Sequence, residues 1–165
     1  MVGAWRALRI VHLSALVGLT GCGTTLISHP IERQSDGWTV RLDRMAEGYD
    51  SPPLGAGLLT PGTIYKPDDG QRFLHLYLKI RNDAATRRPF HYDQCDLDLG
   101  DRHIEPGLVI NYNGPVHEIP TPEAYDAGEE SARWLIFSYP EHRYPTRLQC
   151  QALTIDFPPL SPAGN

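Results

Sequence analysis

Apolar and polar residues alternate along much of the chain, which is the pattern of β-strands with one buried face. The clearest case is RFLHLYLKIRND, residues 72–83, where four aliphatic residues fall on one side of the strand. These residues predict a side that faces the core. The opposite side is amphipathic instead of fully polar, because it carries Phe73, His75 and Tyr77.

Further segments carry a strand pattern. Residues 37–47 and 90–99 alternate, residues 103–110 form a short strand broken by Pro and Gly, and residues 131–140 are almost continuously apolar. Near the C-terminus, the apolar positions of residues 143–157 begin on one parity and continue on the other. That slip predicts a β-bulge near Gln151 and Ala152.

The segments between the strands are rich in turn residues. Residues 47–71 contain four Pro and five Gly, a density that no central strand or helix tolerates. We expect a long loop there, with one short edge strand near Thr63–Tyr65, and a second turn-rich segment at residues 111–130. No segment shows a helical period. About seven short strands predict an all-β fold, an immunoglobulin-like β-sandwich, with a partly open barrel as the alternative.

The N-terminal segment has a different pattern. Arg6 and Arg9 precede a mostly apolar run from Ile10 to Leu19, and no acid occurs before Glu32. A helix of about ten residues spans roughly 15 Å, half the hydrocarbon thickness of a membrane, so this run is too short to cross one. A basic start followed by a short apolar run is typical of a secretory signal peptide. The alternative is a buried N-terminal helix.

The residues that end this run, Leu19-Thr20-Gly21-Cys22, resemble the lipobox of bacterial lipoproteins. The resemblance implies cleavage before Cys22, a diacylglycerol thioether on its thiol, and acylation of its new amino group. Three acyl chains exceed what stable anchoring requires. Gly23 stands where Asp would retain a lipoprotein of enteric bacteria at the inner membrane. The resemblance therefore predicts a lipid-anchored protein of the bacterial cell envelope, on the outer membrane and facing the periplasm.

These patterns divide the chain into four parts. Residues 1–21 are the expected signal peptide, and the polar, unpatterned residues 22–36 are the expected lipidated tether. Residues 37–158 form the expected β-sandwich domain, which ends where consecutive prolines stop the last strand. Residues 159–165 are expected to form a loose C-terminal tail.

With Cys22 at the anchor, Cys95 and Cys150 remain. An even pair in an oxidising compartment predicts a disulfide bond between them. Closing a loop of this length stabilises a protein by about 4 kcal/mol in the idealised model. The alternatives are a free buried pair and a cysteine-containing metal site. No Cys-x-x-Cys motif is present to indicate redox chemistry or zinc.

The order of segments from residue 70 onward carries a second resemblance. A hydrophobic strand ending in Asn82, a turn-linked strand, a Pro/Gly region, and Gly128 followed by RWLIFSYP are similar to small immunoglobulin-like domains found in bacterial lipoproteins. Those domains are of unknown function. The similarity covers roughly residues 38–157 and implies a fold, because the family offers no established catalytic residues.

The charged and nucleophilic residues show no pattern typical of a catalytic or metal site. The chain has 20 acidic and 15 basic residues, a formal net charge of −5, and no basic block, so nucleic acid is not an expected partner. The carboxylates of residues 93–105 alternate with apolar residues, as a solvated strand face does, and lack the spacing of an EF-hand loop. The histidines form no His-x-His or His-x-x-x-His pair, and no Gly-x-Ser-x-Gly motif occurs. We expect no catalytic residue, metal or cofactor.

The amphipathic face of residues 72–83 offers a candidate binding surface. Phe73, His75 and Tyr77, with Tyr92 beside them, are expected to form an exposed protein-binding strip. The alternative is that the loop of residues 47–71 covers them. The sequence thus predicts a non-enzymatic, lipid-anchored interaction or accessory module with an envelope protein as its partner. A periplasmic lipoprotein that binds a small ligand or metal ion is the alternative, and a hydrolase of unrecognised type comes third.

Overall fold

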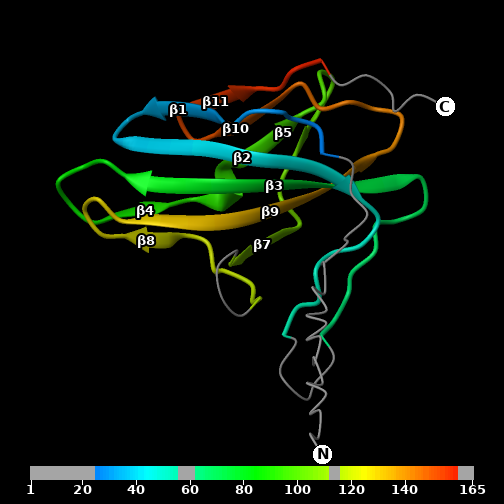
Figure 1. The fold of residues 1–165 in the computed structure, drawn as a ribbon, viewed down its shortest axis with the longest axis horizontal. Helices are drawn as coiled ribbons and strands as arrows, with labels where there is room; N and C mark the ends of the chain where they lie inside the picture. The colour runs from blue at the N-terminus through cyan, green and yellow to red at the C-terminus, as the bar shows by residue number, and fades with distance from the viewer. Residues whose placement is uncertain (1–24, 56–61, 112–115, 160–165) are drawn as a thin grey trace, which may run out of the picture.

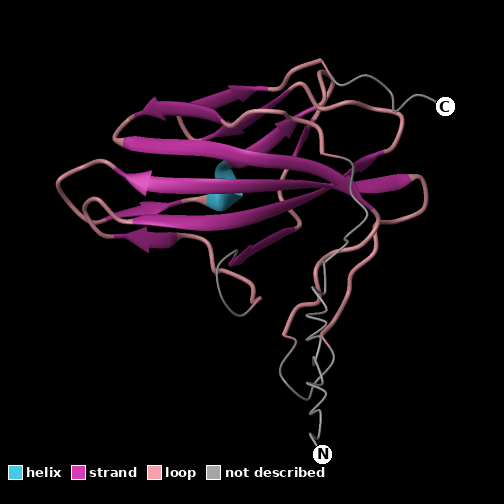
Figure 2. Ribbon diagram, in the orientation of Figure 1, coloured by secondary structure: helices cyan, strands magenta, loops and turns pink. Residues whose placement is uncertain are grey.

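The computed structural model describes residues 25–55, 62–111 and 116–159 of the chain. Two antiparallel sheets face each other around one main apolar core, and a two-stranded ladder lies at one end of the larger sheet (Figure 1). The described part of the chain contains one short helix, the 3-10 turn η1 (Tyr92–Gln94), and is otherwise strands and loops (Figure 2). The predicted all-β sandwich is confirmed.

The larger sheet has the strand order β1-β2-β3-β9-β7, and every neighbouring pair is antiparallel. Its central strand, β3 (Gln71–Asn82), pairs with β2 (Trp38–Gly48) on one side and with β9 (Glu130–Pro140) on the other. Its edges are β1 (Ile31–Ser35) and β7 (Leu108–Asn111).

The smaller sheet has the order β11-β10-β5-β6 and is also antiparallel. Its strands are β11 (Leu153–Asp156), β10 (Arg147–Cys150), β5 (Cys95–Asp98) and β6 (His103–Ile104). The separate ladder joins β4 (Arg88–Phe90) to β8 (Glu123–Tyr125).

This topology is immunoglobulin-like. In their order across each sheet, β2, β3, β9 and β7 take the places of strands A, B, E and D, while β11, β10 and β5 take those of G, F and C. The described residues hold eleven strands instead of about seven. The excess comes from short strands at edges and in the turn-rich segments, where few side chains are buried and alternation is weak.

The alternation of β3 is the main support of the core. Leu74, Leu76, Leu78 and Ile80 are each at most 1% exposed. They share one buried cluster with residues of the opposite sheet, among them Leu97, Leu148 and Ile155. Burying each such side chain stabilises the fold by about 1.5–3 kcal/mol.

Part of the expected tether is a strand, so its predicted boundaries are wrong. β1 pairs with β2 through a two-residue turn at Asp36 and Gly37, whose φ angles of 48° and 71° suit a type I′ hairpin. β1 has no apolar alternation because it is an edge strand held by backbone hydrogen bonds. The packed region begins earlier still, since the amide of Leu26 donates to the carbonyl of Met45 and Ile27 is buried.

The predicted bulge near Gln151 and Ala152 is also wrong, because these two residues form the turn of a hairpin between β10 and β11. Across this turn Cys150 pairs with Leu153, and the φ of Gln151 is 52°. Paired residues of an antiparallel ladder point to the same side of the sheet. A two-residue turn places the pair three positions apart, which produces the change of parity seen in the sequence.

Candidate functional site

The predicted binding strip does not form as an exposed surface. Phe73 and His75 are only 7% and 6% exposed, and Tyr92 is fully buried in the main core, on the inner side of the larger sheet. Only Tyr77 is half-buried. The prediction for Tyr92 is wrong because η1 interrupts the chain there and the alternation of β5 begins only at Cys95.

A second, smaller apolar cluster on the outer face of the larger sheet explains the burial of Phe73. Phe73 packs there with Ile110 and Ile136, and Leu54 of the long loop lies against them. Leu108, Val116 and Trp134 complete the cluster. The alternative expectation, that the loop of residues 47–71 covers the strip, therefore holds at the Phe73 end.

Elsewhere on this face Arg44 is exposed, and Tyr77 and Trp134 are half-buried. Together with the buried His75 they form what we call the aromatic patch. The rings of Tyr77 and Trp134 stack with centroids 4.7 Å apart, and the Arg44 guanidinium lies 5.1 Å from the centre of the Tyr77 ring. Arg44 and Trp134 are the direct cross-strand partners of Tyr77 in β2 and β9. A β-bulge between Leu42 and Arg44 brings Arg44 into that register.

The buried His75 side chain is hydrogen bonded to the indole of Trp134. Its Nδ1 accepts a hydrogen bond of 3.1 Å from Trp134 Nε1. Burial, together with the nearby charge of Arg44, lowers the pKa of His75 to about 4, so the ring is neutral at neutral pH. Since Nδ1 is an acceptor, the proton of the neutral ring is on Nε2, and this nitrogen lies against Gly48. His75 therefore positions the indole.

A buried ionic network lies around β8 and β9. Glu123 accepts hydrogen bonds from the Tyr92 hydroxyl at 2.6 Å and from Arg133 Nε at 2.8 Å, and its other oxygen bonds a second nitrogen of Arg133. Burial alone would raise the pKa of Glu123, but the hydrogen bonds from Arg133 and Tyr92 outweigh it and lower the pKa. The Tyr125 hydroxyl lies 2.7 Å from that of Tyr92. This network joins β8 to β9 and to η1, and the charges of Glu123 and Arg133 neutralise each other within it.

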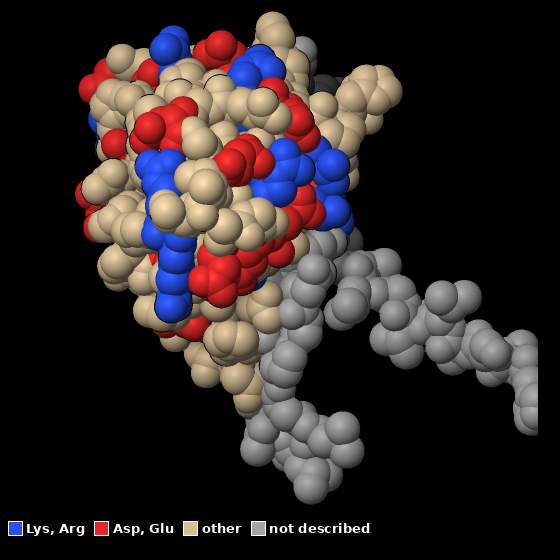
Figure 3. Space-filling model, turned by 90° about the vertical axis from the view of Figure 1, so that its left-hand side faces the viewer, with Lys and Arg blue, Asp and Glu red and all other residues tan. Residues whose placement is uncertain are grey.

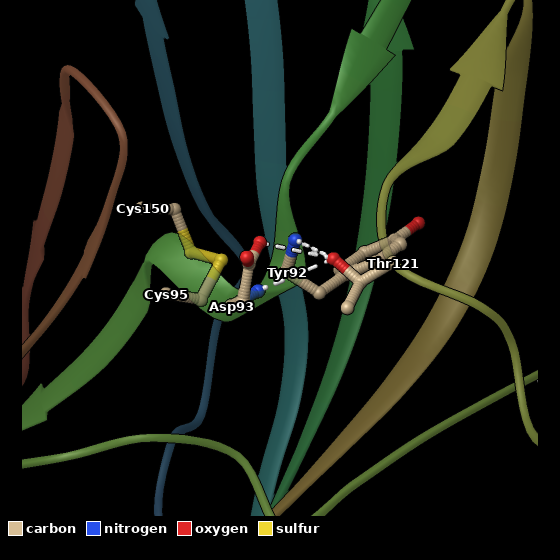
Figure 4. Close-up of a disulfide and its surroundings, with 5 residues drawn as sticks. All are labelled: Tyr92, Asp93, Cys95, Thr121 and Cys150. Carbon is tan, nitrogen blue, oxygen red and sulfur yellow. Dashed lines mark hydrogen bonds between the residues drawn. A yellow bond between two sulfur atoms is a disulfide. The ribbon is translucent and has the colours of Figure 1, made fainter.

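The predicted disulfide between Cys95 and Cys150 is supported. The two residues are direct partners in the β5–β10 ladder, and their sulfur atoms are bonded (Figure 4). The bond thus lies within one sheet, whereas the disulfide of antibody domains joins the two sheets. Beside it, Thr121 Oγ1 accepts from the amide of Tyr92 and donates to the Asp93 carboxylate, which fastens η1 to the segment before β8 (Figure 4).

The acidic residues that raised the question of calcium are in part paired with arginines. Asp98 lies 3.2 Å from Arg147, and Asp101 lies 3.1 Å from Arg143. Across the described ranges no group of three or more His, Cys, Asp or Glu side chains is arranged to hold a metal ion. Acidic and basic side chains both lie on the face drawn in Figure 3, where a narrow run of basic side chains has acidic ones beside it.

Two shallow hollows are the best-formed concave features of the described surface. One, of about 280 Å³, is lined by residues of the segment between β2 and β3, including Tyr49 and Lys66, and by Glu141 directly after β9. The other, of about 230 Å³, lies beside η1 and includes Asp93 and Glu105. Both are smaller than the usual ligand pocket of about 300–1,000 Å³, so neither hollow by itself supports the small-ligand alternative.

The lipobox and Cys22 lie outside the described residues, as do residues 160–165 of the expected tail. Their assignments stay predictions. Among the residues that are described, no helix is both long and apolar enough to span a membrane.

No protein-family model and no curated protein sequence matches the chain. Among solved structures, it is similar to an uncharacterised β-sandwich protein from Clostridium difficile 630, with a TM-score of 0.53 and 11% identity, over 75% of this chain and 86% of that one. It is also similar to a conserved hypothetical protein from Bacillus anthracis, with a TM-score of 0.50 and 8% identity, over 82% and 97% of the two chains. Likenesses at such low identity establish the fold alone: the chain is a small β-sandwich domain of a type found in bacteria.

Proposed function

We propose that this chain is a lipid-anchored protein of the bacterial cell envelope whose sandwich is a non-enzymatic interaction module. The lipobox resemblance at residues 19–22 supports the anchor, and the paired cysteines suit an oxidising compartment outside the cytoplasm. Gly23 after the lipidated cysteine favours the outer membrane, with the domain facing the periplasm. The membrane and one envelope protein are its partners in this proposal.

The aromatic patch is the observation that carries the interaction role. Trp, Tyr and Arg are the residues that most often dominate binding energy in protein interfaces. In this patch they are already stacked and hydrogen bonded, so their side chains lose little conformational entropy when a partner binds. Arg44 is exposed and positively charged, which suits a partner surface that offers a carboxylate beside an apolar residue.

Arg44→Glu tests the patch, because this exposed residue can be reversed in charge without disturbing the core. With a photo-crosslinking residue at Lys79, which is half-buried in the same sheet, we expect one discrete crosslinked product in living cells. Arg44→Glu is expected to reduce its yield at least tenfold, a loss of about 1.4 kcal/mol. Arg102→Glu, exposed on the loop before β6, is the matched control and should leave the yield unchanged. Equal yields from both variants would refute the patch as the binding surface.

Cys22→Ala tests the anchor. If Cys22 carries the lipid, the variant cannot receive a diacylglycerol and should appear as an unprocessed or soluble product. Membrane fractionation and the intact mass of the chain measure this outcome. Thr24→Ala, which keeps the cysteine, should fractionate like the wild type. A Cys22→Ala chain that stays in the membrane fraction with normal processing contradicts the lipobox assignment.

A further inference from the structure

An arm extends from the sandwich directly after β2. It consists of residues 49–55 and 62–66, and it hangs below the larger sheet in Figure 1. Its two sides are joined by backbone hydrogen bonds: the amide of Ser51 donates to the carbonyl of Tyr65, and Leu54 and Thr63 exchange two bonds of 2.9 Å. The described part of the arm is thus an ordered two-sided structure.

Contacts at Leu54 and Gly55, away from the base of the arm, hold its position against the sandwich. Leu54 packs on the outer apolar cluster of Phe73, Ile110 and Ile136. The amide of Gly55 donates to the carbonyl of Val116 at 3.1 Å, which ties the arm to the segment after β7. These contacts fix the direction in which the arm leaves the sheet.

The arm carries every large apolar side chain that is exposed within the described ranges. Tyr49, Ile64 and Tyr65 are 57%, 55% and 47% exposed. Elsewhere on the described surface, residues of this kind are at least half-buried. Concentration of exposed apolar surface on one projecting element is typical of a contact site.

The chain enters the domain beside this arm. Thr25 forms a β-bridge with Ala46, which lies three residues before Tyr49 in the sequence. Cys22 lies three residues before Thr25. An extended chain covers at most about 3.5 Å per residue, so Cys22 lies within roughly 11 Å of Thr25. In Figure 1 the described chain enters on the same side of the sandwich as the base of the arm.

From this juxtaposition we propose that Tyr49, Ile64 and Tyr65 of the arm insert into the headgroup layer of the membrane that holds the lipid of Cys22. The inference rests on the lipid anchor of the proposed function. The headgroup region on each side of a bilayer is about 5–8 Å thick, comparable with the reach of so short a connection. Lipidation would therefore place the base of the arm close to the membrane surface.

The residues of the arm suit this environment. Tyrosine is enriched at membrane interfaces, where its ring lies among acyl chains and its hydroxyl stays hydrated. The described arm carries one acid, Asp50, and one base, Lys66, so its formal charges cancel. The contact is therefore apolar, and it should form on zwitterionic lipid and resist added salt.

The test places a fluorophore on the arm of the full, lipidated chain. A Tyr65→Cys variant offers a single reactive thiol when Cys22 carries lipid and Cys95 is bonded to Cys150. In phosphatidylcholine vesicles with brominated acyl chains, we expect the probe to be quenched at least twofold, equally at low and high salt. A probe at Ala85→Cys, exposed in the loop after β3 at the far end of the sheet, is the control and should not be quenched.

A second variant changes the arm at a residue other than the one that carries the fluorophore. Ile64→Asp in the Tyr65→Cys background should restore most of the fluorescence, because a charged side chain in place of the apolar one weakens insertion of the arm at the membrane interface. Equal quenching at Tyr65 and Ala85 overturns the membrane contact while a lipid mass on Cys22 leaves the anchor intact. Shielding of the Tyr65 probe without vesicles, rising with protein concentration, overturns it in favour of a second copy. Absence of the lipid mass overturns the proposed anchor, and the arm proposal with it.

Discussion

Arg133→Met is expected to destabilise the protein by about 3–5 kcal/mol, the usual cost of removing one partner of a buried ion pair. Arg133 is 8% exposed, and the side chain of its partner Glu123 is 22% exposed. Without the guanidinium, the carboxylate keeps only uncharged partners among those described, the hydroxyls of Tyr92 and Tyr125. It must then stay charged in a poorly solvated site or take up a proton, and both outcomes reduce the free energy of unfolding. Urea unfolding at neutral pH measures the loss.

Two comparisons isolate the buried pair. Arg143→Met removes a pair with Asp101 whose side chains are each 50% exposed, and it should cost less than about 1 kcal/mol. The double variant Arg133→Met with Glu123→Leu should be more stable than Arg133→Met alone, because no unpaired charge is left. If Arg133→Met costs no more than Arg143→Met, the network does not stabilise the fold in this way.

Removal of the disulfide is expected to cost about 2–4 kcal/mol. Cys95 and Cys150 are 55 residues apart in sequence, so the bond restricts a long loop of the unfolded chain. Both residues are almost fully buried, and a Cys95→Ala, Cys150→Ala double variant keeps this site apolar. Urea unfolding with and without a reductant measures the effect.

The reductant supplies the control for this prediction. Wild-type protein under reducing conditions should approach the stability of the double variant, while the double variant itself should not respond to the reductant. Mass spectrometry of the non-reduced chain should show Cys95 joined to Cys150. Two free thiols in that sample, or a wild type insensitive to reductant, would contradict the prediction.

The elements that the sequence predicted correctly are those marked by the type and spacing of their side chains. β3 was predicted with its buried face because Leu74, Leu76, Leu78 and Ile80 repeat with the period of a strand and pack into the main core. The pairing of Cys95 with Cys150 was predicted by elimination, once Cys22 had been assigned to the lipid. The signal for β3 lies in neighbouring residues, and the signal for the disulfide is the number of cysteines that remain.

β1 was missed because backbone hydrogen bonds hold it and most of its side chains face solvent. A usable signal was nevertheless present: Asp36-Gly37 directly before an alternating strand is typical of a two-residue hairpin. The hairpin at Gln151 and Ala152 carried no such signal, because neither residue is a usual hairpin turn former. Its parity change could be interpreted equally well as a bulge.

The candidate site was predicted in part. Tyr77 and His75 were named, but Trp134 and Arg44 were not, since they lie 57 and 33 positions from Tyr77 and meet it only through strand register. Tyr92 was placed with them by assuming unbroken alternation from residue 90. A single 3-10 turn moved it to the opposite side of the sheet and into the core.

The sequence by itself determined the all-β class, the buried face of β3, the cysteine pair and the resemblance of residues 19–22 to a lipobox. These properties depend on side-chain type and short-range spacing, which any single chain displays. Only the tertiary structure decided which amphipathic residues are covered, how Arg44, Tyr77 and Trp134 stack, and that the arm lies beside the entry of the chain. Those outcomes depend on register and on loop packing between residues far apart in sequence, where small differences in backbone path move a side chain from one face of a sheet to the other.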